Sequence, residues 1–122
     1  MSIVVIIRYS VILIILSLTL LLGSSTGKIT GRIVDAKTKI PLAGCNIIVE
    51  KTILGSSSDI DGYYTIYNVP PDVYSIRAQM IGYSELIITD VVINIDLTTV
   101  LNFNLNIQAI DGKTITVKAE KS

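Results

Sequence analysis

Histidine and cysteine, two side chains that often carry out catalysis, are nearly absent from this chain. Its 122 residues include no histidine and a single cysteine, Cys45. Without histidine, a zinc peptidase site built from His and Glu, a Ser-His-Asp triad and a Cys-His pair are all excluded. Cys45 alternates with Ile47 and Val49, so we expect a buried and therefore inert thiol. The sequence predicts a protein that is not an enzyme and carries no cofactor.

One acidic stretch could in principle hold a metal ion. Asp59 and Asp61 precede Gly62, which faintly resembles a calcium-binding loop. An EF-hand loop needs further oxygen ligands and a glutamate at its end, and residues 63–71 supply none. Asp-Gly is also a strong hairpin-turn signal, because glycine tolerates positive φ. We therefore expect a hairpin turn here and no metal site.

Two sets of polar side chains are candidates for a partner or ligand surface. Tyr63 and Tyr67 alternate with the expected core residues Tyr64 and Ile66. Exposed tyrosines can stack on sugars or anchor a protein partner, although ordinary cross-strand packing is an alternative. The second set alternates with apolar residues in the stretch 100–108, and a wetted outer sheet face is its alternative. Its members are Asn102, Asn104 and Asn106.

These candidates need strands to position them, and two-residue alternation runs through most of the chain. Asp90 interrupts one apolar run and predicts a bend or bulge there. Short strands separated by Gly, Pro and Asp turns are typical of a sandwich. We expect an all-β, seven-stranded antiparallel β-sandwich with strands at residues 28–35, 45–49, 55–58, 63–69, 74–80, 83–95 and 100–108.

The N-terminus predicts export. Ile3 to Leu22 is almost wholly apolar around Arg8, and small residues follow from Gly23 to Gly27. A basic residue, an apolar core and a small-residue region indicate a signal peptide, while an uncleaved membrane anchor is the alternative. We expect a hydrophobic signal helix at residues 1–26, a sandwich at 27–109, and a terminal strand or linker at 110–122.

The order of the turn and strand motifs resembles a known family. Along the chain the motifs are GRIVD at 31–35, IPLAG at 40–44, DIDGYYTI at 59–66, NVPP at 68–71, YSI at 74–76 and IGY at 81–83. This ordered set resembles the carboxypeptidase regulatory-like domain, a transthyretin-like (prealbumin-like) sandwich. The resemblance implies that Leu42 inserts under one end of the sandwich and that Tyr74 forms a tyrosine corner. Asp72 stands where the family usually has glycine.

The resemblance implies a non-catalytic accessory module. Such domains occur at the N-terminus of TonB-dependent outer-membrane receptors that import nutrients, where a signal peptide leads into the sandwich and a plug and barrel follow. Residues 114–121 are similar to the segment that joins the sandwich to the plug. The implied partner is then a downstream plug and barrel, and the location is the periplasm or outer membrane. The alternative is a stand-alone secreted or anchored domain that binds carbohydrate or protein. Nothing indicates a nucleic-acid surface, since the formal net charge is +0.

Overall fold

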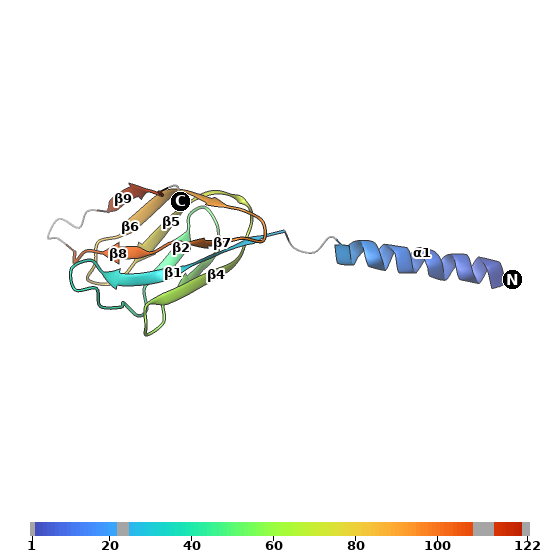
Figure 1. The fold of residues 1–122 in the computed structure, drawn as a ribbon, viewed down its shortest axis with the longest axis horizontal. Coiled ribbons are helices and arrows are strands. Elements are labelled where there is room, and N and C mark those ends of the chain that lie inside the picture. Colours follow the sequence, from blue (N-terminus) through green and yellow to red (C-terminus); the bar gives the residue numbers. More distant parts are fainter. Residues whose placement is uncertain (1, 22–24, 109–113, 121–122) are drawn as a thin grey trace.

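The computed structural model describes residues 2–21, 25–108 and 114–120, with side chains described for 2–16, 25–108 and 114–120. One helix, α1 (Ser2–Leu21), lies apart from two packed layers of strands (Figure 1). No helix in the described residues is long and apolar enough to cross a membrane. The strands are β1 (Gly27–Asp35), β2 (Asn46–Val49), β3 (Gly55–Ser57), β4 (Tyr63–Val69), β5 (Asp72–Gln79), β6 (Leu86–Ile93), β7 (Thr98–Val100), β8 (Phe103–Leu105) and β9 (Ile115–Lys118).

The strands form a first sheet and a second sheet. In the first sheet, β1 pairs with β4 on one side and with β7 and then β8 on the other. The second sheet has the order β3-β2-β5-β6-β9. The all-β sandwich is therefore confirmed, but the prediction of seven antiparallel strands is wrong. The described residues form nine strands, and the pairs β1–β7, β1–β8 and β6–β9 are parallel.

Two strands exceed the expected seven. One is β9, which lies in the segment expected as a terminal strand or linker, and the other arises because the single strand expected at 100–108 is replaced by β7 and β8. Between them Leu101 and Asn102 leave the regular ladder, and the Leu101 carbonyl crosses over Gly31. The Tyr64 hydroxyl donates to that carbonyl at 2.6 Å. Phe103 and Leu105 are buried as the alternation predicts, whereas Ile107 is 68% exposed because it lies beyond the end of β8.

The core lies between the layers and uses the residues expected from alternation. Tyr64, Ile66, Cys45 and Leu42 are all buried, which confirms these predictions. The Tyr64 and Phe103 rings meet at 6.1 Å between centroids. The remaining buried apolar side chains are Ile29, Ile33, Ile47, Val49, Val69, Ile76, Ala78, Ile88, Val91, Ile93 and Leu105.

Two predicted backbone features are confirmed and one needs correction. The Tyr74 hydroxyl donates to the Pro70 carbonyl at 2.7 Å, which is the geometry of a tyrosine corner. Asp90 has φ of 57° at a register shift between β5 and β6, so it marks a bulge. The Asp59–Gly62 turn forms, but its flanking strands β3 and β4 lie in different sheets, so it is not a hairpin.

Candidate functional site

Tyr63 and Tyr67 project from the outer side of the first sheet. They are 53% and 65% exposed, while the intervening Tyr64 and Ile66 point into the core. Beyond Ile66 the β1–β4 register shifts, so that Ile66 pairs with Ile29 but Val69 pairs with Gly27. The extra residue on β4 is accommodated by a positive φ of 57° at Asn68. The bulge twists this end of β4 without turning Tyr67 into the core.

Each exposed tyrosine carries a cation from β1 beside its ring. The Arg32 guanidinium carbon lies 5.0 Å from the centroid of Tyr63, and Lys28 Nζ lies 5.9 Å from that of Tyr67. Such contacts are worth about 0.5–1 kcal/mol at exposed sites. Arg32 Nε also donates to the Asp61 carbonyl at 2.9 Å. In the described part of the chain no carboxylate forms an ion pair with either cation.

Cross-strand register arranges these side chains in three rows. Thr30 occupies the middle of β1, and its hydroxyl donates to the Tyr64 carbonyl and contacts the Thr65 hydroxyl at 3.1 Å. Parallel pairing with β7 adds Thr98 and Val100 on the other side. We call the resulting surface the first-sheet face. Its rows are Tyr63–Arg32–Asn102, Thr65–Thr30–Val100 and Tyr67–Lys28–Thr98. A hydrogen bond joins Asn102 to Arg32, and the cation–ring contact joins Tyr67 to Lys28 across the register shift.

The three predicted asparagines do not form one binding row. Asn102 Oδ1 accepts a hydrogen bond from the Arg32 amide at 2.9 Å, replacing the carbonyl that the broken ladder lacks. Its amide therefore has a structural role on the first-sheet face. Asn104 pairs with Val34 farther along β1, and Asn106 follows the end of β8. Both are exposed, but they lie toward the end of the sheet opposite Tyr67.

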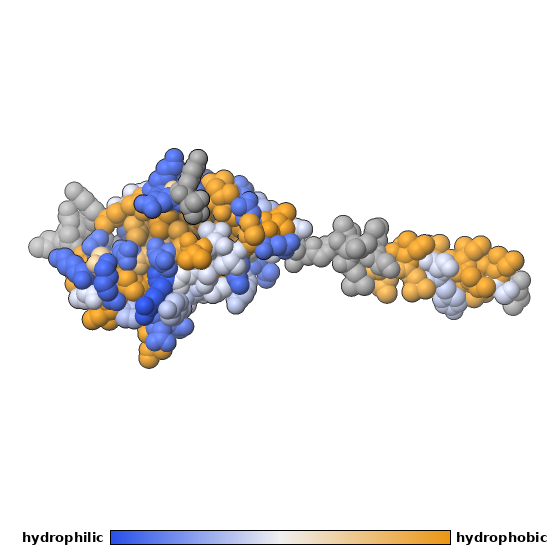
Figure 2. All heavy atoms as spheres, viewed as in Figure 1, coloured by the Kyte–Doolittle hydropathy of each residue, from blue (hydrophilic) through white to orange (hydrophobic). Residues whose placement is uncertain are grey.

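The first-sheet face ends in a shallow hollow beside Tyr67. This hollow has a volume of about 240 Å³, and its lining includes Thr26, Lys28, Tyr67, Asn68, Asp96 and Thr98. Figure 2 shows the surface over β1, β4 and β8 as mainly pale and blue, the colours of polar side chains. Lys28, Thr30 and Arg32 alternate with buried residues along β1, so their outward direction follows from the two-residue period of a strand. Sequence reasoning missed their pairing with the tyrosines and the contribution of Asp96, because both depend on cross-strand register.

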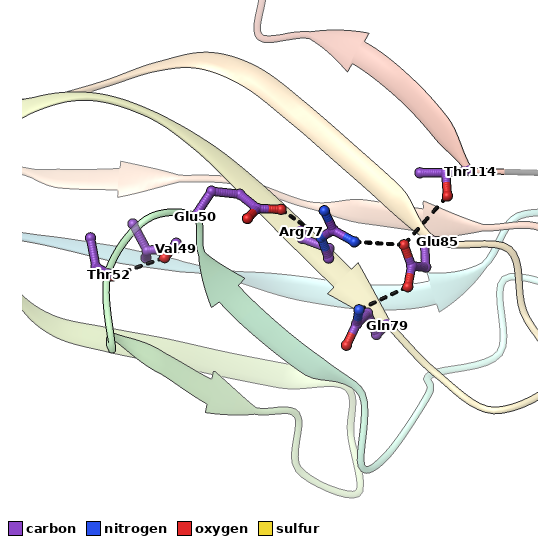
Figure 3. Close-up of polar contacts among 7 residues, drawn as sticks. All are labelled: Val49, Glu50, Thr52, Arg77, Gln79, Glu85 and Thr114. Carbon is purple, nitrogen blue, oxygen red and sulfur yellow. Dashed lines mark hydrogen bonds and ion pairs between the residues drawn. The ribbon is translucent and has the colours of Figure 1, made fainter.

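On the outer side of the second sheet, the charged side chain of Arg77 is paired with two glutamates (Figure 3). Arg77 donates from Nε to Glu50 at 2.5 Å and from Nη1 to Glu85 at 2.9 Å. The hydrogen bond to Glu50, together with the charges of both glutamates, raises the pKa of Arg77 above its usual value. Gln79 and Thr114 also donate to Glu85. This cluster ties β2, β5, β6 and the start of β9 together, so we interpret it as structural.

Comparison with known protein families identifies the chain. A family model described as the CarboxypepD_reg-like domain matches residues 29–117, which is well over half of the sequence. The chain belongs to the carboxypeptidase regulatory-like domain family. No curated protein matches this regulatory-like domain in sequence.

Solved structures similar to this regulatory-like domain share its fold at low identity. One is a type II cohesin–X-dockerin complex from Acetivibrio cellulolyticus, with TM-score 0.54, 21% identity, and coverage of 72% of this chain and 64% of that chain. A second is a proposed carbohydrate-binding protein of Bacteroides uniformis, with TM-score 0.51, 18% identity, and coverage of 64% and 40%. The Bacillus anthracis TIE protein gives TM-score 0.53 at 18% identity, with coverage of 69% and 17%. The chain thus spans less than two thirds of these proteins.

The described residues of the regulatory-like domain contain no arrangement suited to catalysis. Burial raises the pKa of Cys45 to about 11, so its thiol stays protonated at neutral pH. Asp59 Oδ1 accepts hydrogen bonds from the amides of Asp61 and Tyr63, so it closes the turn. No group of three or more metal-ligating side chains occurs in the part of the chain that the structure describes.

Proposed function

We propose that this chain is a non-catalytic, exported interaction module that binds its partner through the first-sheet face. The observation that carries the proposal is the pairing of two exposed tyrosines with two cations that lack carboxylate partners in the described residues. Arginine and tyrosine are among the residues enriched at interfaces. On the second sheet, by contrast, the charge of Arg77 is balanced by ion pairs with Glu50 and Glu85.

The setting that fits this proposal best is the N-terminal accessory domain of a TonB-dependent outer-membrane nutrient receptor. Family membership supports it, as does the order of an apolar N-terminal stretch followed directly by the sandwich. In this setting residues 1–26 direct export, and the sandwich lies in the periplasm at the outer membrane. Sequencing the transcript beyond the codon for Ser122 tests the setting. An in-frame plug and barrel is the expected result, and a stop codon directly after Ser122 would contradict it.

Binding through the first-sheet face is tested by site-specific photocrosslinking in cells. A photoreactive phenylalanine analogue replaces Tyr63 or Tyr67, which preserves an aromatic ring at each position. Val92 provides the control, because it is 53% exposed on the outer side of the second sheet. We expect crosslinked species from positions 63 and 67 and none from position 92. Crosslinks from position 92 alone, or from none of the three, would reject this face as the binding surface.

A second candidate function is a stand-alone secreted or anchored domain that binds carbohydrate or a surface protein. The hollow beside Tyr67 favours it, because a polar depression next to an exposed aromatic ring suits a sugar. The reading frame separates the two candidates: a chain ending at Ser122 that still crosslinks through Tyr63 and Tyr67 would favour the stand-alone domain.

A further inference from the structure

We infer that the first-sheet face binds an acidic glycan, a chain of sugars that carry carboxylates. This inference rests on the proposed role of the face in binding and adds the chemical class of the ligand. One sugar ring would lie in the hollow beside Tyr67, and the carboxylates of neighbouring sugars would pair with Lys28 and Arg32.

The charge of the face is the first argument. Arg32 uses Nε for the Asp61 carbonyl, while its Nη groups have no hydrogen-bond partner among the described residues. Those groups can donate two parallel hydrogen bonds to one carboxylate. Lys28 Nζ adds a second positive charge on the same strand. Arg77 and Lys118, which do form ion pairs with carboxylates, lie on the second sheet.

The spacing of the two cations favours a polymer over a small acid. Lys28 and Arg32 are four residues apart on β1, which corresponds to roughly 13 Å along a strand. This separation exceeds the width of one sugar ring. With Lys28 Nζ beside the Tyr67 ring and the Arg32 guanidinium beside the Tyr63 ring, a single small carboxylate would pair with one cation, whereas an oligosaccharide lying along β1 could reach both.

The hollow has the side chains that sugar hydroxyl groups require. Asn68 offers an amide that donates and accepts, Asp96 offers a carboxylate that accepts, and Thr98 offers a hydroxyl. The exposed Tyr67 ring provides a flat apolar surface on which a pyranose can stack. Because Asp96 would repel an anion, we place a hydroxyl-bearing part of the sugar in the hollow and the carboxylates toward Lys28 and Arg32.

A protein partner of acidic character fits the face less well. Protein interfaces usually contain a buried apolar centre. In the three rows of the first-sheet face the one aliphatic side chain is Val100, which is 66% exposed, and in the hollow it is Leu97, which is 58% exposed, so neither is a buried centre. Threonines occupy the middle row beside it. The face therefore matches a hydroxyl-rich ligand better than a typical protein surface.

The test measures binding of matched acidic and neutral oligosaccharides to the chain beginning at Ser25. This chain keeps the whole buried core, because the core contains no described residue of α1. Isothermal titration calorimetry would use hexagalacturonate and its fully methyl-esterified form, and then oligoalginate and hyaluronan oligosaccharides. We expect at least one acidic oligosaccharide to bind, and the methyl ester to bind at least fivefold more weakly than hexagalacturonate if that probe is recognised. Lys28→Gln and Arg32→Gln should each weaken binding about fivefold, and Tyr67→Ala should weaken it about tenfold.

Lys118→Gln is the matched control, because it removes one positive charge from the outer side of the second sheet. It should change affinity by less than twofold. All the substituted side chains are exposed or half-buried, and melting temperatures verify that each variant folds. Binding to no acidic oligosaccharide, or equal loss with Lys118→Gln, would overturn the inference. If no acidic oligosaccharide bound but crosslinks still formed from positions 63 and 67, the interaction face would stand and the glycan would be rejected.

Discussion

The buried hydroxyl of Ser58 links the segment after β3 to the connection between β1 and β2. It accepts from the Cys45 amide at 2.9 Å and donates to the Leu42 carbonyl at 2.6 Å. We predict that Ser58→Ala lowers the free energy of unfolding by about 1–3 kcal/mol, because both buried backbone groups lose their partner. Urea denaturation measures this change. Ser57→Ala is the control, since Ser57 is exposed and bonds the exposed Asn46 side chain, and a similar loss there would contradict the assignment.

Asp35 makes the fold sensitive to acid. Its carboxylate accepts from the amides of Lys37 and Thr38 and from the Tyr83 hydroxyl at 2.9 Å. The hydrogen bond from the Thr38 amide, followed by that from Tyr83, lowers the pKa of Asp35 below its ordinary value of 3.8. Since the folded pKa is the lower one, the stabilisation is complete above about pH 4. It is lost as pH falls through the folded pKa.

We therefore predict that Asp35→Asn destabilises the protein at pH 7 and that the difference from wild type shrinks below pH 4. Thermal unfolding between pH 2 and pH 7 measures it. Tyr83→Phe removes one of the bonds and should show a smaller loss with the same direction of pH dependence. A wild-type advantage that stayed constant down to pH 2 would contradict the role of the ionised carboxylate.

At the scale of elements, the division of the last alternating stretch into β7 and β8 depends on Gly31. A Cβ at this position would overlap the Leu101 carbonyl and would reach the Tyr64 ring at 3.0 Å. Gly31 is not among the residues with positive φ, so backbone entropy alone predicts that Gly31→Ala stabilises by about 0.4–1 kcal/mol. We predict instead a loss of about 3 kcal/mol from overpacking. Chemical denaturation decides between the two signs.

The cluster around Arg77 holds the edge strand β9 in place (Figure 3). The Glu85 carboxylate accepts hydrogen bonds from the side chains of Arg77 and Thr114. The Glu85 carbonyl accepts a hydrogen bond from the Ile115 amide at 2.8 Å. We predict that Arg77→Met speeds hydrogen exchange at the Ile115 amide about three- to tenfold. Global stability should fall by less than about 1 kcal/mol, because partly exposed ion pairs contribute little.

Lys118→Gln provides the comparison for β9. The Lys118–Asp90 pair is 3.7 Å long, and both side chains are more than half exposed. Its loss should leave exchange at Ile115 unchanged. Faster exchange in Lys118→Gln but not in Arg77→Met would show that the cluster does not anchor the strand.

At the scale of the whole molecule, the sandwich is complete without α1. The buried cluster runs from Ile29 to Leu105 and includes no described residue of the helix. We predict that removing residues 1–24 changes the free energy of unfolding by less than about 0.5 kcal/mol, the usual range for changes outside the core. Urea denaturation of the two chains measures the difference. A loss of several kcal/mol would mean that the N-terminal segment supports the sandwich.

Local patterns in the sequence were sufficient for the class of fold and for the inward or outward direction of most side chains. Two-residue alternation placed Tyr64, Ile66 and Cys45 in the core and Tyr63 and Tyr67 outside, because burial of one strand face is a local property. The absence of histidine by itself excludes a Ser-His-Asp triad, a Cys-His pair and a zinc site with histidine ligands, since each of these requires an imidazole. The bulge at Asp90 could also be predicted, because a charge interrupts an apolar run there.

Only the tertiary structure decided which strands are neighbours. Pairing of β1 with both β4 and β7 brings Lys28 and Arg32 beside tyrosines more than thirty positions away, and a shift of one residue would separate them. The carbonyl of Leu101 divides one expected strand in two, and Asn102 repairs the broken ladder with its side chain. Register between distant strands depends on the packing of the whole core, so no local pattern in the sequence encodes it.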